Sequence, residues 1–184
     1  MPTNNNFDEK EILQELKNPS TQSAAFSKIV KQYSEPLYWH IRRMVLSHDD
    51  TNDLMQNTFI KAWTSIDNFR GDSQLSTWLY RIAINETLTF LSKRSPSIPI
   101  DSPEATVVEQ LESDPYFNGD IAEATFQEAL QKLPPKQRMV FNMKYYEEMK
   151  YDERSQILGT SVGSLKASYH IAVKKIEEFL KEKD

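Results

Sequence analysis

Apolar residues recur at intervals of three and four through most of this 184-residue chain, and this spacing constrains its fold more than any other feature. Such spacing gathers side chains on one face of an α-helix, whereas a half-buried strand alternates apolar and polar residues. The sequence shows no such alternation, and only 4 residues are glycine, which disfavours turn-rich β architectures. We therefore predict an all-α protein.

The helical periodicity stops between residues 95 and 120. This segment, SPSIPIDSPEATVVEQLESDPYFNGD, holds four prolines and six carboxylates but no basic residue. Its composition is typical of a linker that is largely extended. The sequence therefore predicts two small helical domains, over residues 1–94 and 121–184, joined by an acidic, proline-containing linker over 95–120.

The net charge of −5 comes from this linker. Residues 1–94 carry 11 basic and 11 acidic side chains, and residues 121–184 carry 11 and 10. Neither block is strongly basic, so any affinity for nucleic acid has to come from local faces rather than from a global field.

Several classes of function lack the residues that they need. There is no cysteine, which excludes disulfides and thiolate-bound metals. His40, His48 and His170 do not have the spacing of metal ligands. Residues 49–53, DDTND, match a pattern that holds magnesium diphosphate, but they open an amphipathic helix, where capping and dipole complementarity explain them. We expect no catalytic residue, no metal and no cofactor.

The sequence also lacks features of export. No apolar run reaches the length of about 18 residues that crosses a bilayer. The beginning of the chain, MPTNNNFDEKEILQEL, lacks the basic start and apolar core of a signal peptide, although a short helix over Phe7–Leu16 is expected. We expect a cytoplasmic protein without membrane insertion.

The first block predicts four further helical segments. A stripe around Ile29 precedes Ser34-Glu35-Pro36, and proline suits the first turn of a new helix better than a helix interior. A third helix begins near Asp49, and a polar break surrounds Gly71 before a fourth. The expected buried stripe of the third helix consists of Leu54, Met55, Phe59, Ala62 and Trp63.

The stretch ILGTSVGSLKASYHIAVKK has the form of a helix-turn-helix. Gly159 can end the first helix in the left-handed conformation, and Thr160 or Ser161 can cap the second. The outward face of the second helix has small side chains first and cations later, as a recognition helix in the major groove requires. The same pattern also suits an amphipathic helix in a bundle that does not bind DNA.

Two longer motifs carry a resemblance to a known family. The segments DLMQNTFIKAW and FRGDSQLSTWLYRIAINETLTFL resemble region two of bacterial sigma factors of the extracytoplasmic-function group. The segment from LQKLPPKQRMVFNMKYYEEMK to the last helix is similar to their region four. The resemblance covers nearly all of the chain beyond about the first twenty residues.

The resemblance implies that the third helix docks on the clamp helices of core RNA polymerase. Asn52 and Asn57 stand where the family often has acids, and Phe59 and Trp63 also suit a packing role. The implied docking residues are Asp50, Asp53, Leu54, Gln56, Asn57 and Phe59.

The resemblance further implies that the loop from Arg70 to Ser76 and the next helix capture non-template bases of the minus-ten element. Trp78 suits either stacking on a base or packing. Ser76 and Ile84 occupy positions where the family commonly has basic residues. The implied residues are Arg70, Gly71, Asp72, Ser73, Thr77, Trp78, Arg81 and Asn85.

The second block is implied to bind the minus-thirty-five element as duplex. Arg154 departs from the family pattern, because an apolar residue is usual there; its stem either passes along the core or reaches the DNA backbone. The implied residues are Ser164, Lys166, Ala167, His170, Ile171 and Lys174.

The implied function is that of a sigma factor, which directs core RNA polymerase to specific promoters and assists their opening. Its expected partners are core polymerase, promoter DNA as duplex and as non-template single strand, and an anti-sigma factor. Two alternatives stay open at this point. One is a stand-alone helix-turn-helix repressor or activator, and the other is an adaptor that binds only proteins.

Overall fold

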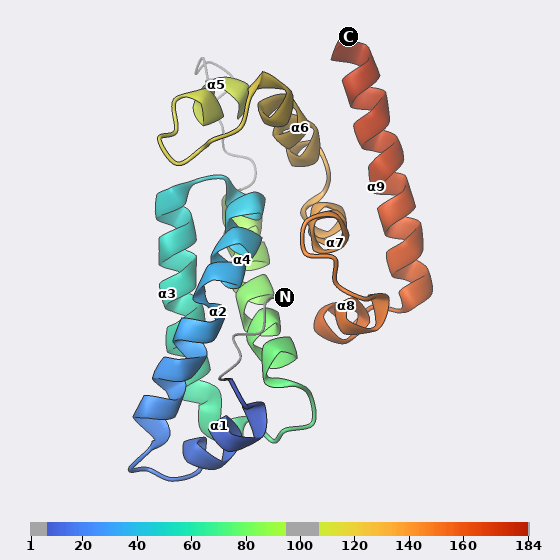
Figure 1. The fold of residues 1–184 in the computed structure, drawn as a ribbon. Coiled ribbons are helices and arrows are strands. Elements are labelled where there is room, and N and C mark those ends of the chain that lie inside the picture. The colour runs from blue at the N-terminus through green and yellow to red at the C-terminus, as the bar shows by residue number, and fades with distance from the viewer. Residues whose placement is uncertain (1–6, 95–106, 184) are drawn as a thin grey trace. The chain divides into compact units, whose positions relative to one another are not determined.

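The computed structural model describes residues 7–94 and 107–183, and all regular structure within these ranges is helical. Residues 95–106, the first part of the predicted linker, lie outside the described residues. The prediction of an all-α fold is confirmed (Figure 1). The helices are α1 (Glu9–Leu16), α2 (Gln22–Val45), α3 (His48–Ser65), η1 (Ile66–Asn68), α4 (Leu75–Arg94), α5 (Val107–Glu112), α6 (Ile121–Gln131), α7 (Pro135–Tyr145), α8 (Tyr151–Leu158) and α9 (Val162–Lys183).

The chain divides into two compact units, residues 1–87 and 88–184. The boundary lies inside α4, whereas the sequence prediction placed it at residue 94, where the same helix ends. The difference arises because α4 is one unbroken helix of 20 residues, so composition changes only at its end. The predicted bounds of the domains and linker remain predictions.

In the first unit, α2 packs against both α1 and α3. It is a single helix of 24 residues that contains Pro36, so the predicted break at this proline is wrong. A proline inside a helix removes one backbone hydrogen bond. Here Ile29, Tyr33, Leu37 and other apolar side chains are buried on both sides of it, and their burial outweighs that loss.

Helix α3 buries a narrower stripe than its sequence predicts. Its buried residues are Thr51, Leu54, Thr58 and Ala62, at intervals of three and four. Small side chains let two helices approach closely, and α3 packs against α2. Trp63 is therefore left 40% exposed, and its predicted burial is wrong.

The second unit contains a helix that the composition of the linker did not predict. Helix α5 packs against α6, and Leu111 is buried. Val107, Val108 and Leu111 lie at helical spacing, which gives these six residues an apolar side in spite of the acids around them. The prediction of an extended segment is wrong for residues 107–112.

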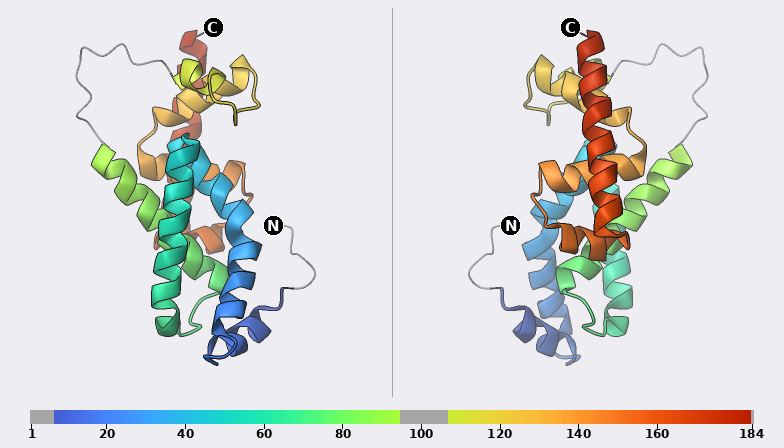
Figure 2. Two further views of the ribbon diagram at one scale, coloured as in Figure 1. Left: turned by 90° about the vertical axis from the view of Figure 1, so that its left-hand side faces the viewer. Right: turned by 90° about the vertical axis from the view of Figure 1, so that its right-hand side faces the viewer.

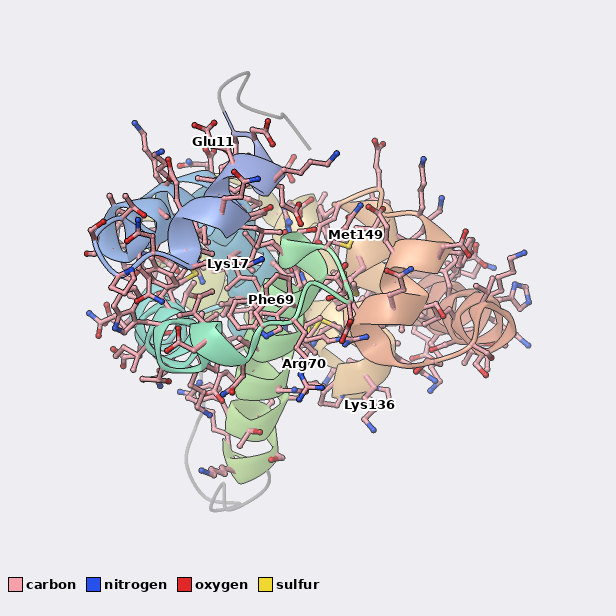
Figure 3. All side chains as sticks on the ribbon, turned by 90° about the horizontal axis from the view of Figure 1, so that it is seen from below. Glu11, Lys17, Phe69, Arg70, Lys136 and Met149 are labelled. Atoms are coloured by element: carbon pink, nitrogen blue, oxygen red, sulfur yellow. The ribbon has the colours of Figure 1, made fainter. Side chains whose placement is uncertain are left out.

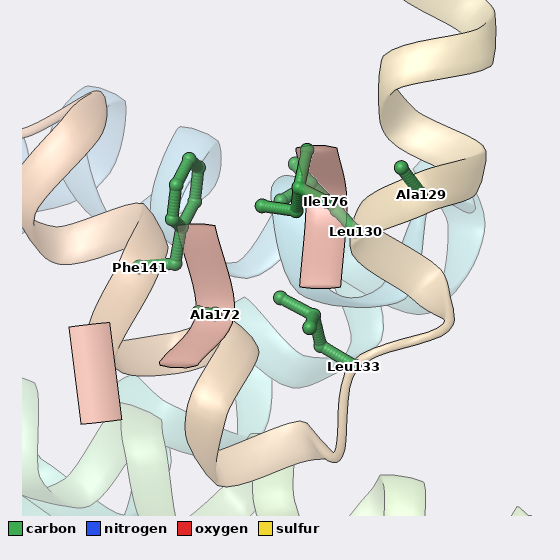
Figure 4. Packing of buried hydrophobic residues seen from close by; sticks show 6 residues of the cluster. All are labelled: Ala129, Leu130, Leu133, Phe141, Ala172 and Ile176. Carbon is green, nitrogen blue, oxygen red and sulfur yellow. The ribbon is translucent and has the colours of Figure 1, made fainter. Parts of the chain in front are cut away.

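Helices α6, α7 and α9 enclose the core of the second unit. Its cluster joins α6, the turn after it, α7 and α9 (Figure 4). The aromatic ring of Phe141 stacks on that of Tyr169 with centroids 5.5 Å apart. Helix α9 is the long red helix that leads to the C-terminus in both views of Figure 2. The buried cluster consists of Ala129, Leu130, Leu133, Phe141, Ala172 and Ile176.

Candidate nucleic-acid and protein interfaces

The helix-turn-helix is formed by α8 and α9. Gly159 has φ +62°, the left-handed conformation predicted for the residue that ends α8. The hydroxyl oxygen of Ser161 accepts a hydrogen bond from the backbone N–H of Ser164 at 3.2 Å, which caps α9 as expected. Gly159 therefore ends α8, and the hydrogen bond between Ser161 and Ser164 determines where α9 begins.

The outward face of α9 has the predicted composition. Leu165, Ala172 and Ile176 are buried and attach the helix to its unit. The opposite face carries small side chains in its first turns and cations farther along, and even the apolar Ile171 is 45% exposed. The structure brings together all six residues predicted for the minus-thirty-five element, each of them exposed: Ser164, Lys166, Ala167, His170, Ile171 and Lys174.

Tyr151, the first residue of α8, lies beside this face. Its ring centroid is 5.3 Å from the ammonium nitrogen of Lys166 and 3.9 Å from the guanidinium carbon of Arg154. Arg154 is fully buried, so in this structure it stacks on an aromatic ring instead of lying at the surface. The π-electrons of the ring attract both cations and restrict the directions in which Lys166 can extend.

Helix α3 presents a second exposed face. Ser47 caps the helix through the backbone N–H of Asp50, and Asp49 and Asp50 lie in its first turn, where carboxylates complement the helix dipole. Of the predicted docking residues, Asp53, Gln56 and Asn57 are exposed, and Asp50 and Phe59 are half-buried. Leu54 is buried among the core residues, so its side chain does not contribute to this surface.

The exposed face of α3 continues into an apolar end. Ile60 is 60% exposed and Trp63 40% exposed, one turn apart. Trp63 also makes an edge-to-face contact with Phe26 of α2, with ring centroids 5.0 Å apart, which holds its indole in place. Neighbouring apolar side chains exposed together on a surface are a common feature of sites of protein association. Helix α3 therefore offers a face that is polar at its beginning and apolar at its end.

The predicted loop follows η1, and Figure 3 labels Phe69 and Arg70 on it. The ring of Phe69 packs on that of Trp78, with centroids 5.1 Å apart. Gly71 has φ +77°, a left-handed conformation that favours glycine. Arg70, Gly71 and Asp72 are exposed, so the loop presents a cation before the glycine and an anion after it.

Helix α4 contributes the rest of the predicted minus-ten set apart from Ser73. Arg81 and Asn85 are exposed one turn apart, and Trp78 lies half-buried one turn before them. Ser73, in the loop, is half-buried. Thr77 is buried and is not available to bind DNA from this structure. Its side chain points into the helical bundle because the buried stripe of α4 includes the neighbouring Leu75, Leu79 and Tyr80.

The start of α4 is tied to α1, an arrangement that the sequence did not predict. The carboxylate of Glu9 accepts a hydrogen bond from the backbone N–H of Leu75 at 2.8 Å. Nearby, the buried Tyr33 has its pKa raised to about 12, first by burial and next by the charge of Glu9, while a side-chain hydrogen bond with Ser76 opposes the rise. The first residues of α4 thus lie against α1 and α2.

The sequence prediction of docking residues on α3 did not include the exposed Ile60 and Trp63, and at the two candidate DNA sites it missed Tyr151 and Glu9. Tyr151 could have been found, because an aromatic residue three positions before an arginine on one helix is a local signal for ring–cation contact. Glu9 had no such signal, since 66 residues separate it from the N–H that it binds.

Two family models match this chain. The model described as Sigma-70 region 2 matches residues 29–96, and the model described as Sigma-70, region 4 matches residues 123–176. The ECF RNA polymerase sigma factor SigW of Bacillus subtilis (strain 168) is 33% identical over 156 residues, which cover 79% of this chain and 83% of SigW. The RNA polymerase sigma-H factor of Pseudomonas aeruginosa is 30% identical over 166 residues, covering 85% and 86% of the two chains.

Two solved structures of known proteins are similar to this chain. The sigma factor RpoE, in complex with the anti-sigma factor NepR from Bartonella quintana, has a TM-score of 0.65 and 26% identity, covering 85% of this chain and 96% of RpoE. CnrH, in complex with the cytosolic domain of CnrY, has a TM-score of 0.71 and covers 96% and 99% of the two chains. At 22% identity, CnrH shows a likeness of fold alone.

The all-helical fold with its helix-turn-helix and the two family matches define a regulator of the sigma-70 class. Within it, this chain belongs to the extracytoplasmic-function group of sigma factors. It is a sigma factor that directs RNA polymerase in transcription initiation. In the residues that the structure describes, no helix has both the length and the apolar character of a membrane span.

Proposed function

We propose that three surfaces of the protein have separate roles in promoter recognition. The outer face of α9 reads the minus-thirty-five element, the loop and α4 hold non-template bases of the minus-ten element, and the exposed face of α3 docks on core polymerase. The observation that carries the proposal is the exposure of all six predicted residues of α9 on the second helix of a helix-turn-helix.

The chemistry of the α9 face supports duplex DNA as its ligand. Ser164 and Ala167 are small enough to let the helix approach base edges closely, while Lys166 and Lys174 can reach phosphates or bases. The blocks over residues 1–94 and 121–184 have net charges of 0 and +1. Such weak charge gives little affinity without help, so selectivity depends on polymerase holding both DNA-binding faces at once.

The α4 site suits unstacked bases instead of duplex. Arg70 and Arg81 supply cations for phosphates, and Asn85 can hydrogen-bond a base edge. Trp78 serves mainly to hold Phe69, and through it the loop, because the two rings are in contact. We assign the docking surface to Asp53, Gln56, Asn57, Ile60 and Trp63, with Asp50 and Phe59 at its edge.

Reconstitution with bacterial core polymerase tests this function. The full chain, with and without core enzyme, is used to select promoters from a library of random duplexes, and the recovered DNA is footprinted and transcribed. We expect co-purification with core enzyme, two protected elements and initiation only when both components are present. Tight, specific binding by the chain alone would instead indicate a stand-alone repressor or activator, and polymerase binding without initiation an adaptor.

We propose further that the protein acts in the cytoplasm with polymerase and performs no covalent chemistry. An anti-sigma factor is also proposed as a partner, because the RpoE structure to which this chain is similar was solved with NepR. A pull-down from the source cells tests this partner. A protein that competes with core polymerase for the chain is the expected result, and co-binding in one ternary complex would contradict it.

A further inference from the structure

The first helix of the protein reaches the point where α4 begins. Leu75 is the first residue of α4 and is fully buried, so its backbone N–H cannot be satisfied by bulk water. The first four N–H groups of a helix have no partner within the helix. The carboxylate of Glu9 supplies one, with its Oε1 2.8 Å from the backbone nitrogen of Leu75.

A second contact reinforces this point of attachment. The side chains of Tyr33 of α2 and Ser76 of α4 lie close enough to interact, and the charge of Glu9 helps to raise the pKa of Tyr33. Burial of Ile12 and Leu16 attaches α1 to α2. Glu9 therefore projects from a packed helix and is itself fixed in position.

The other end of the loop is also held. Phe69 packs on Trp78, and the side-chain amide of Gln22 donates a hydrogen bond to Asp67 at 2.9 Å. Between these attachments lie the exposed Arg70, Gly71 and Asp72. A loop that is fixed at both ends loses less conformational entropy when it binds a ligand.

We propose that Glu9 is a positioning residue for the minus-ten site, which it serves by fixing the start of α4 and with it the direction of the loop 70–74. The inference rests on the function proposed above for this loop. Glu9 does not touch DNA; its carboxylate oxygen acts through the N–H of Leu75. This gives α1, which lies outside both matched family regions, a part in promoter opening.

Three full-length variants isolate this role. Glu9→Ala removes the acceptor, and Glu9→Gln keeps a carbonyl oxygen that can accept the same hydrogen bond. Glu11→Ala is the matched control, because Glu9 and Glu11 are both acids in the first turn of α1 and Glu11 is exposed (Figure 3). The control therefore reproduces any loss of interaction with the α1 dipole.

Each variant is assembled into holoenzyme and tested on the selected promoter, with 2-aminopurine in the non-template strand of the minus-ten element to report unstacking. For Glu9→Ala we expect about fivefold to tenfold slower opening, since the lost hydrogen bond involves a charged acceptor. Core affinity and minus-thirty-five protection stay within about twofold of wild type, because those faces lie elsewhere. Glu9→Gln recovers at least half of the lost rate, and Glu11→Ala matches wild type.

The outcomes separate this inference from the proposed function. If wild-type holoenzyme does not open the promoter, the proposed function fails. If wild type opens it and Glu9→Ala does so equally fast, only the positioning role is overturned. It is also overturned if Glu9→Gln is as slow as Glu9→Ala, or if Glu11→Ala is equally slow, because the acceptor oxygen would then not be the cause.

Discussion

The two candidate DNA sites of this protein are built in different ways. The α9 site lies on one helix, where the same periodicity that buries Leu165, Ala172 and Ile176 exposes the opposite face. The α4 site combines a loop, the beginning of a helix and contacts from α1 and α2. A substitution on the exposed face of α9 should therefore change binding without changing stability, whereas one at the α4 site should change both.

The largest expected effect is on stability, from Trp78→Ala. Removing the indole deletes its contact with Phe69 and exposes apolar surface, which should lower the free energy of unfolding by about 2–3 kcal/mol. Thermal or urea unfolding measures it, and Trp78→Phe should retain most of the stability. Wild-type stability in Trp78→Ala, together with weaker binding of single strands, would show a stacking residue instead.

The pH dependence of stability should come next in size. Below pH 10 Tyr33 is neutral in both states; between pH 10 and about 12 the unfolded chain loses this proton while the folded protein retains it. Stability therefore falls as pH rises through this window, by about 2 kcal/mol for this residue. Tyr33→Phe should flatten the loss in alkaline urea titrations. A slope identical to wild type would exclude Tyr33 as the source.

Lys166→Ala tests the α9 site, where binding should change without a change in stability. We expect about a tenfold weaker minus-thirty-five interaction in holoenzyme, since one contact to a base or phosphate is lost. The free energy of unfolding should not change. Lys181→Ala, an exposed lysine in the last turn of the same helix, is the control for net charge. Equal losses in both variants would mean that α9 acts through charge alone.

The smallest expected effect on DNA binding concerns Tyr151. Tyr151→Leu keeps apolar volume but removes the ring that faces Lys166, so Lys166 should lose its preferred direction. We expect about a twofold weaker footprint at the minus-thirty-five element. The effect should vanish when Lys166 is already alanine, and a double-mutant cycle measures this coupling. Additive losses would show that the two residues act independently.

Features that depend on nearby residues could be predicted from the sequence, whereas features that depend on distant contacts could not. Helices, the left-handed Gly159 and the exposed face of α9 depend on residues a few positions apart, and these predictions are confirmed. The predictions for Pro36 and Trp63 are wrong because tertiary packing determines their environments. Helix α2 continues through its proline, and α3 buries small threonines instead of its tryptophan.

The α4 site shows most clearly what could not be predicted from the sequence. The sequence predicts a segment for this site, but whether Thr77 faces the bundle or the surface depends on how α4 is rotated about its axis, and the structure buries it. That rotation depends on distant contacts, such as the one between Glu9 and Leu75. The spacing of residues within one segment does not predict such distant contacts.

The apolar end of α3 has a consequence for how the holoenzyme should respond to ionic strength. If Ile60 and Trp63 dock on polymerase as proposed, their burial removes apolar surface from water, a process that added salt does not weaken. In the proposed function the lysines of α9 contact phosphates, and such contacts release counterions, which added salt opposes strongly. Raising the salt concentration should therefore detach promoter DNA while the protein stays on the polymerase, so that the two associations can be separated in one titration.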